Sequence, residues 1–90
     1  MSLIKVFYFA RLKESLNYST EEIELPSDVE TIAELKVLLA QRGETWAQLF
    51  SDKQTVRAAI NHALVDNDAR IKSGDEVAFS HLLQVVKVFI

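Results

Sequence analysis

The pattern of hydrophobic and polar positions predicts two strands at the start of the chain. Residues 3–9, Leu-Ile-Lys-Val-Phe-Tyr-Phe, are rich in the β-branched and aromatic side chains that favour strands. Residues 21–25 alternate between polar and apolar side chains, as a strand with one buried face does. The polar residues 17–20 predict a turn, and Pro26 ends the second strand because proline cannot continue a central strand. We therefore predict a β-hairpin with a long connection.

A helix is predicted next. Both Ser27-x-x-Glu30 and Thr31-x-x-Glu34 have the spacing of a capping box, in which a hydroxyl and a carboxylate satisfy free N–H groups of the first turn. Thr31 is the better cap, because the apolar residues that follow then form one stripe: Ile32, Leu35, Leu38 and Leu39. Gly43 is the expected stop. Residues 44–51 suggest a short second helix that covers one end of the core.

Three further strands are expected in the second half of the chain. The first two cover residues 55–61 and 64–65, and the last starts at residues 76–79. A turn is expected at 61–63, a loop at 66–68 and a tight turn at 72–75. The predicted fold is therefore α+β, a mixed sheet of four to five strands crossed by one main helix. That order is typical of the β-grasp, or ubiquitin-like, arrangement.

Composition narrows the function classes. The 90 residues suffice for one domain, and the formal net charge of −3, with no basic run, argues against nucleic-acid binding. Without cysteine there is no disulfide, thiolate nucleophile or Cys-type zinc site, which fits a cytoplasmic protein. No segment approaches the roughly 18 apolar residues of a membrane span, so no membrane association is expected.

Side-chain chemistry indicates no active site. His62 and His81 are the only histidines, and with no third ligand at a plausible spacing a metal site is not expected; His62 is interpreted as a turn residue. Gly43 and Gly74 stand alone, so the chain has no Gly-rich phosphate loop. We expect no catalytic residue, cofactor or metal.

Two phenylalanines of the first strand point to a binding surface instead. If Ile4, Val6 and Tyr8 face the helix, Phe7 and Phe9 lie on the opposite face of the sheet. Other parts of the chain could cover them. Alternatively they form a docking patch, since contiguous exposed aromatic side chains often mark an interface.

Three motifs give the chain a specific resemblance. They are Phe-Ala-Arg-Leu-Lys-Glu at 9–14, Ile-Asn-x-x-Leu-Val at 60–65 and Ser-Gly-Asp-Glu-Val-Ala-Phe at 73–79. Together they make residues 3–79 similar to the small subunit of molybdopterin synthase, a ubiquitin-like sulfur carrier. The β-grasp fold expected from the pattern is that of this family.

This resemblance implies that the reactive group of the family is the C-terminus rather than a side chain. In the family an ATP-dependent, E1-like activating enzyme adenylates a terminal Gly-Gly, and sulfur then replaces AMP to give a thiocarboxylate. The tail delivers this sulfur inside the large subunit of molybdopterin synthase. By match to the family's apolar contact positions, Phe9 and Leu64 are expected to bind the large subunit, with Phe7 nearby. Alternation with Val77 assigns Phe79 to the core.

Residues 80–90 depart from the family pattern. No glycine follows Gly74, so we expect a β-grasp domain over residues 1–79 and an atypical apolar tail over 80–90 that is inactive as a sulfur carrier. One explanation is a lost base: with suitable synonymous codons, restoring one T before the Ser80 codon makes the tail read Phe-Pro-Pro-Val-Thr-Gly-Gly-stop. The other explanation is a lineage-specific tail with its own role.

Two other functions stay open. The chain could be a ubiquitin-like binding module that carries no sulfur. It could also self-associate, because residues 82–90 are apolar apart from Gln84 and Lys87 and could pair as a strand with a second chain.

Overall fold

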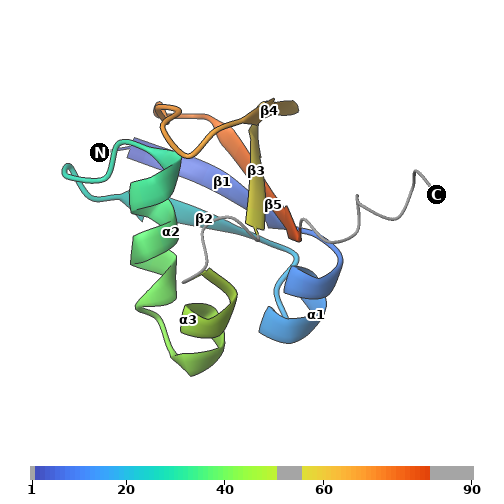
Figure 1. The fold of residues 1–90 in the computed structure, drawn as a ribbon. Helices are drawn as coiled ribbons and strands as arrows, with labels where there is room; N and C mark the ends of the chain where they lie inside the picture. Colours follow the sequence, from blue (N-terminus) through green and yellow to red (C-terminus); the bar gives the residue numbers. More distant parts are fainter. Residues whose placement is uncertain (1, 51–55, 82–90) are drawn as a thin grey trace.

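The computed structural model describes residues 2–50 and 56–81, which form a five-stranded sheet and three helices. The elements in chain order are β1 (Ser2–Tyr8), α1 (Arg11–Leu16), β2 (Thr20–Leu25), α2 (Ile32–Ala40), α3 (Glu44–Phe50), β3 (Val56–Ile60), β4 (Ala63–Val65) and β5 (Glu76–His81). Helix α2 crosses one face of the sheet, and α1 and α3 lie together at one end of it (Figure 1). The predicted α+β, β-grasp architecture is confirmed.

The strand order in the sheet is β2-β1-β5-β3-β4. The central strands β1 and β5 run parallel, whereas the other three neighbouring pairs are antiparallel. The sheet is therefore mixed, and the end of the chain's described part lies in its middle. This position matters for function because anything that follows β5 leaves from the centre of the sheet.

The core lies between the sheet and α2, as the alternation in the first strand predicts. Ile4, Val6 and Tyr8 of β1 are at most 2% exposed, and Phe79 of β5 is fully buried. Helix α2 contributes three side chains of its predicted apolar stripe, and α3 adds one more, so the buried set includes Ile32, Leu35, Leu39 and Phe50. The assignment of Phe79 to the core is confirmed.

Helix α1 was not predicted. The sequence suggested a long connection between the first two strands, but residues 11–16 form a helix that buries Leu12 completely. The helix ends at Asn17, which adopts the left-handed conformation (φ 61°) that asparagine tolerates at helix C-termini. Leu12 and Leu16, four residues apart, were the available signal for this one-and-a-half-turn helix.

The start of α2 is as predicted and its end is not. Thr31 accepts a hydrogen bond from the Glu34 N–H (3.2 Å), and the Glu34 carboxylate accepts one from the Thr31 N–H (3.1 Å), which completes the capping box. The helix ends at Ala40 rather than at Gly43. Instead, the Gly43 carbonyl accepts from the Ala47 N–H (2.8 Å), so this glycine begins α3, the predicted short second helix.

Strand β5 starts at Glu76, as predicted, and runs to His81. Ser80 pairs with Arg57 and His81 pairs with Val56, so both residues belong to the sheet. The predictions for residues 82–90, including their pairing as a strand, lie outside the described residues. No helix in the described part of the chain has the length and apolar character needed to cross a membrane.

Candidate protein-docking surface

An apolar row crosses four strands on the face of the sheet opposite α2. Phe7 pairs with Ala78, Ala78 with Ala59, and Ala59 with Leu64. Because side chains at paired positions point to the same face, these four residues form one continuous row, here called the apolar row. The register thus brings the predicted residues Phe7 and Leu64 onto one surface.

Phe9 extends this row at the end of β1. Its ring stacks on that of Phe7, with 6.4 Å between the ring centroids and 16° between the planes. Phe9 is 50% exposed and Leu64 is 70% exposed, whereas Phe7 is half-buried. All three predicted site residues therefore lie on the surface that α2 leaves open.

The backbone around Phe9 fixes where its ring lies. The Phe9 N–H donates to the Phe79 carbonyl (3.0 Å), and the Phe9 carbonyl accepts from the Leu12 N–H in α1 (3.1 Å). Ala10, between them, has φ 55° and ψ −125°, a conformation that costs a residue with a Cβ atom. Strained backbone of this kind persists where the surrounding structure enforces it. Here it is enforced by the hydrogen bonds of Phe9 to β5 and to α1.

A small hollow, here called the notch, lies beside the two phenylalanines. It has a volume of about 120 Å³ and is lined by Phe7, Phe9, His62, Glu76 and Ala78. The methyl side chain of Ala78 leaves this space open between the aromatic rings of β1 and the turn that joins β3 to β4. Sequence reasoning missed Ala59 and Ala78; the signal was a small residue at the outward position of two neighbouring strands.

Hydrogen bonds between Asn61 and β5 hold the turn on the His62 side of the notch. Asn61 donates its N–H to the Glu76 carbonyl (2.8 Å) and accepts the Glu76 N–H at its side-chain oxygen (3.0 Å). Its amide also donates to Asp75 (3.0 Å). Asn61 and His62 both have positive φ, 50° and 75°, as a two-residue hairpin turn requires. The predicted turn at His62 is confirmed.

Charged residues border the apolar row. On one side Lys5 pairs in register with Glu22 of β2 and Glu76 of β5; on the other, Ser80 pairs with Arg57. The His62 Nε2 atom lies 3.7 Å from a Glu76 carboxylate oxygen. An apolar centre with a charged rim is the ordinary anatomy of a protein–protein interface. Ser80 occupies an outward position at this border.

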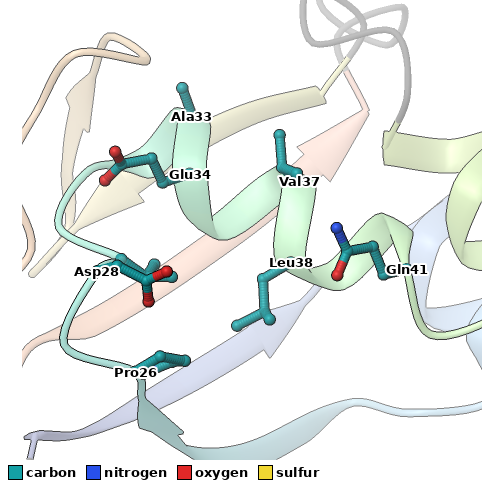
Figure 2. A pocket seen from close by; sticks show the side chains of 8 residues that line it. Pro26, Asp28, Ala33, Glu34, Val37, Leu38 and Gln41 are labelled. Atoms are coloured by element: carbon teal, nitrogen blue, oxygen red, sulfur yellow. The ribbon is translucent and has the colours of Figure 1, made fainter.

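A larger groove lies on the other side of the molecule, between α2 and the loop after β2. It has a volume of about 590 Å³, and Figure 2 shows Leu38 of α2 pointing toward Pro26 across it. Glu34 lines it, but its carboxylate already accepts from the N–H groups of Glu30 (2.7 Å) and Thr31. These hydrogen bonds, the one from Glu30 first, hold the pKa of Glu34 below its ordinary value. Its carboxylate thus serves to cap the helix.

Tyr8, a second titratable group with a shifted pKa, is structural too. Burial raises the pKa of Tyr8, and its hydrogen bond to Glu21 (2.6 Å) adds to the effect. Glu21 also pairs with Arg42 (2.8 Å), whose guanidinium lies 4.7 Å above the Trp46 ring. This network joins β1, β2 and α3 and lies on the α2 side of the sheet. Within residues 2–50 and 56–81, no three His, Cys, Asp or Glu side chains are grouped to hold a metal ion.

The sequence is similar to a known family and to named relatives. The ThiS family matches residues 6–81. The molybdopterin synthase sulfur carrier subunit of Escherichia coli (strain K12) is 35% identical over 77 residues, which cover 86% of this chain and 91% of the relative. The corresponding subunit of Haemophilus influenzae is 34% identical over the same shares of both chains.

Solved structures agree. A putative molybdopterin converting factor, subunit 1, from Pyrococcus furiosus superposes with a TM-score of 0.72 at 27% identity, covering 90% of this chain and 98% of that one. The small archaeal modifier protein 1 of Haloferax volcanii has a TM-score of 0.67 at 19% identity over the same shares, a likeness of fold alone.

Proposed function

Because this chain belongs to the ThiS family, together with the molybdopterin synthase sulfur carrier subunits, we propose that it is the small subunit of a molybdopterin synthase. In this proposal the apolar row and Phe9 bind the large subunit. Under this proposal the chain contributes neither a side-chain active site nor a cofactor. Its folded domain is recognised by the large subunit and by an activating enzyme. It acts in the cytoplasm, where ATP is available.

The proposal rests on the apolar row, which lies on the face of the sheet that does not pack against α2. Helix α2 already provides the core with Ile32, Leu35 and Leu39, so the row adds nothing to the core. Leaving Phe9 and Leu64 half or more exposed costs solubility, and such patches on small domains usually belong to interfaces. The relatives are named as subunits, which supports a partner protein at this face.

The position of β5 suits a carrier. This strand lies in the centre of the sheet and borders the apolar row through Ala78, so a tail that follows it leaves beside the proposed interface. In the proposed reaction the terminal carboxylate attacks ATP, pyrophosphate leaves, and sulfur from a donor then displaces AMP to form a thiocarboxylate. Docking through the row would direct that group into the large subunit.

Residues 80–90 contain no glycine, and we propose that this stretch reflects a lost reading frame. A side chain next to the reacting carboxylate would obstruct a narrow channel, whereas glycine lets the backbone approach closely. We expect the chain with residues 80–90 to bind the large subunit without carrying sulfur, and the frame-restored Phe-Pro-Pro-Val-Thr-Gly-Gly tail to carry it.

Calorimetric titration with the organism's molybdopterin synthase large subunit tests the docking part. Saturable binding with one small subunit per large subunit is expected, and no binding by either tail variant would overturn the proposal. Mass spectrometry tests the tail: with activating enzyme, ATP and a sulfur donor, only the restored tail should exchange one oxygen for sulfur. Codons after Phe79 that are incompatible with the restored reading would contradict the lost frame.

Self-association is a second candidate, favoured by the apolar sequence of residues 82–90 and its single charge at Lys87. In that case deleting residues 81–90 should convert an oligomer to a monomer in sedimentation velocity. A strictly monomeric full chain at high concentration would exclude it.

A further inference from the structure

We propose that the notch receives one bulky apolar side chain of the large subunit, with a basic group of the same partner beside it. This inference rests on the proposed function and adds the chemistry of the contact. It makes Ala78 a specificity-determining residue, although its own side chain offers little area to bind.

The size of the notch suits a single side chain. A volume of about 120 Å³ is far above the roughly 30 Å³ that one water molecule occupies in the liquid. It is close to the roughly 150 Å³ of an apolar cavity that binds benzene. The aromatic rings of Phe7 and Phe9 form one wall and the Ala78 methyl group lies between them and His62. An aliphatic side chain or one aromatic ring fits this space.

The backbone that carries the walls of the notch is preorganised. The Phe9 backbone is held by hydrogen bonds to Phe79 and Leu12, and His62 follows Asn61, which is clasped to β5. Both walls therefore stand on the sheet before a partner arrives. A pocket that is already formed loses little conformational entropy on binding, so an inserted side chain gains affinity there that it would not gain on a mobile surface.

The charge at the rim of the notch indicates which charge the partner carries there. Glu76 lines the notch with its side chain 43% exposed, and one of its carboxylate oxygens lies 3.7 Å from His62 Nε2. Lys5 occupies the position on β1 that pairs with Glu76. A lysine or arginine of the partner beside the inserted side chain complements the Glu76 carboxylate, in keeping with the chain's net charge of −3.

Filling the notch tests the inference, because it adds apolar area while removing the space. We expect Ala78→Val and then Ala78→Leu to weaken calorimetric binding of the large subunit progressively, by about tenfold or more for leucine. Valine favours strands, so the first variant also guards against a leucine variant that fails to fold. Ala63→Leu, on β4 and at the inward register position that pairs with Ile60, is the control and should bind as the parent does.

The outcomes separate this inference from the proposed function. Unchanged or tighter binding by both Ala78 variants, together with weaker binding by Phe9→Ala, would overturn the notch and keep the docking surface. Unchanged binding by Phe9→Ala as well would overturn both. A loss for Ala63→Leu equal to that for Ala78→Leu would also overturn the notch. Finally, Glu76→Gln should slow association and make its rate depend less on salt. If the parent chain associates at the same rate at low and at high salt, the inferred basic group on the partner is wrong.

Discussion

Phe7 and Leu64 lie at the same level of the sheet, three strands apart, with only the methyl groups of Ala78 and Ala59 between them. Three strand spacings of about 4.8 Å place their backbones roughly 14 Å apart. The two large side chains therefore border a shallow apolar strip instead of covering it. A partner could contact both ends of the strip at once, which is why we assign docking to the row as a unit.

The first prediction concerns Phe9. Replacing it with alanine removes an exposed ring at the edge of the apolar row, so binding of the large subunit should weaken by about 1–3 kcal/mol. Folding stability should change little, because half of the ring is already in water. Calorimetry and urea denaturation measure the two effects separately.

Val37 offers the control for Phe9. It is 43% exposed and lies on α2, on the other side of the molecule. Val37→Ala removes a similarly exposed apolar side chain, and its affinity for the large subunit should equal that of the parent. An affinity that falls with Val37→Ala and not with Phe9→Ala would place the interface on the α2 groove.

The second prediction concerns Lys36, a buried lysine in α2. Its Nζ donates to the Val56 carbonyl (2.6 Å) and to the Asn67 side chain (2.8 Å), which ties α2 to β3 and to the loop before β5. Lys36→Met keeps the aliphatic stem but removes these donors, so unfolding should become easier by about 2–4 kcal/mol. Lys13→Met in α1, at an exposed position, should leave the urea midpoint nearly unchanged. Equal midpoints for the two variants would contradict the role of Lys36.

The third prediction concerns the capping box. Thr31→Ala should cost about 1 kcal/mol of stability in thermal or urea denaturation, and Thr31→Ser, which keeps the hydroxyl, should recover most of it.

The same capping box predicts a dependence on acid pH. Because the pKa of Glu34 is lowered in the folded state, its contribution to stability is present above the unfolded-state pKa near 4.3 and disappears as the pH falls through the folded-state pKa. Glu34→Gln should therefore lose less stability than the parent on acidification. An identical acid dependence would refute this.

The fourth prediction concerns alkaline pH. The pKa of Tyr8 is raised by burial and by Glu21, so the folded protein holds this proton more tightly than the unfolded chain does. Tyr8 therefore contributes its full share of folding stability below the unfolded-state pKa of about 10, and this contribution decreases as the pH rises above it. Tyr8→Phe should flatten the fall of the urea midpoint between about pH 9 and 11. In this variant Glu21 keeps Arg42 as its partner.

The sequence predicted most of this fold because its signals were local and repeated. The alternation of Ile4, Val6 and Tyr8 and the spacing from Thr31 to Glu34 each specify one element without help from distant residues. Helix α1 was missed because it is shorter than two turns and depends on packing Leu12 under the sheet, a tertiary effect.

Lys36 was not anticipated for a similar reason. Nothing in α2 indicates that one lysine would be buried, since its partners Val56 and Asn67 lie 20 and 31 residues away. The candidate surface was half foreseen. Phe7, Phe9 and Leu64 could be selected from the sequence, but the row depends on a parallel pairing of β1 with β5, which only the folded register fixes.

Methyl cross-saturation in the complex with the large subunit tests the central claim most directly. Protons of the unlabelled partner are saturated, and the labelled methyl groups of this chain lose signal in proportion to their closeness. We expect strong losses at Leu64, Ala78 and Ala59 and none at Val37, Leu38 and Ala33 of α2. Strong losses on α2 with unaffected methyl groups along the apolar row would contradict it.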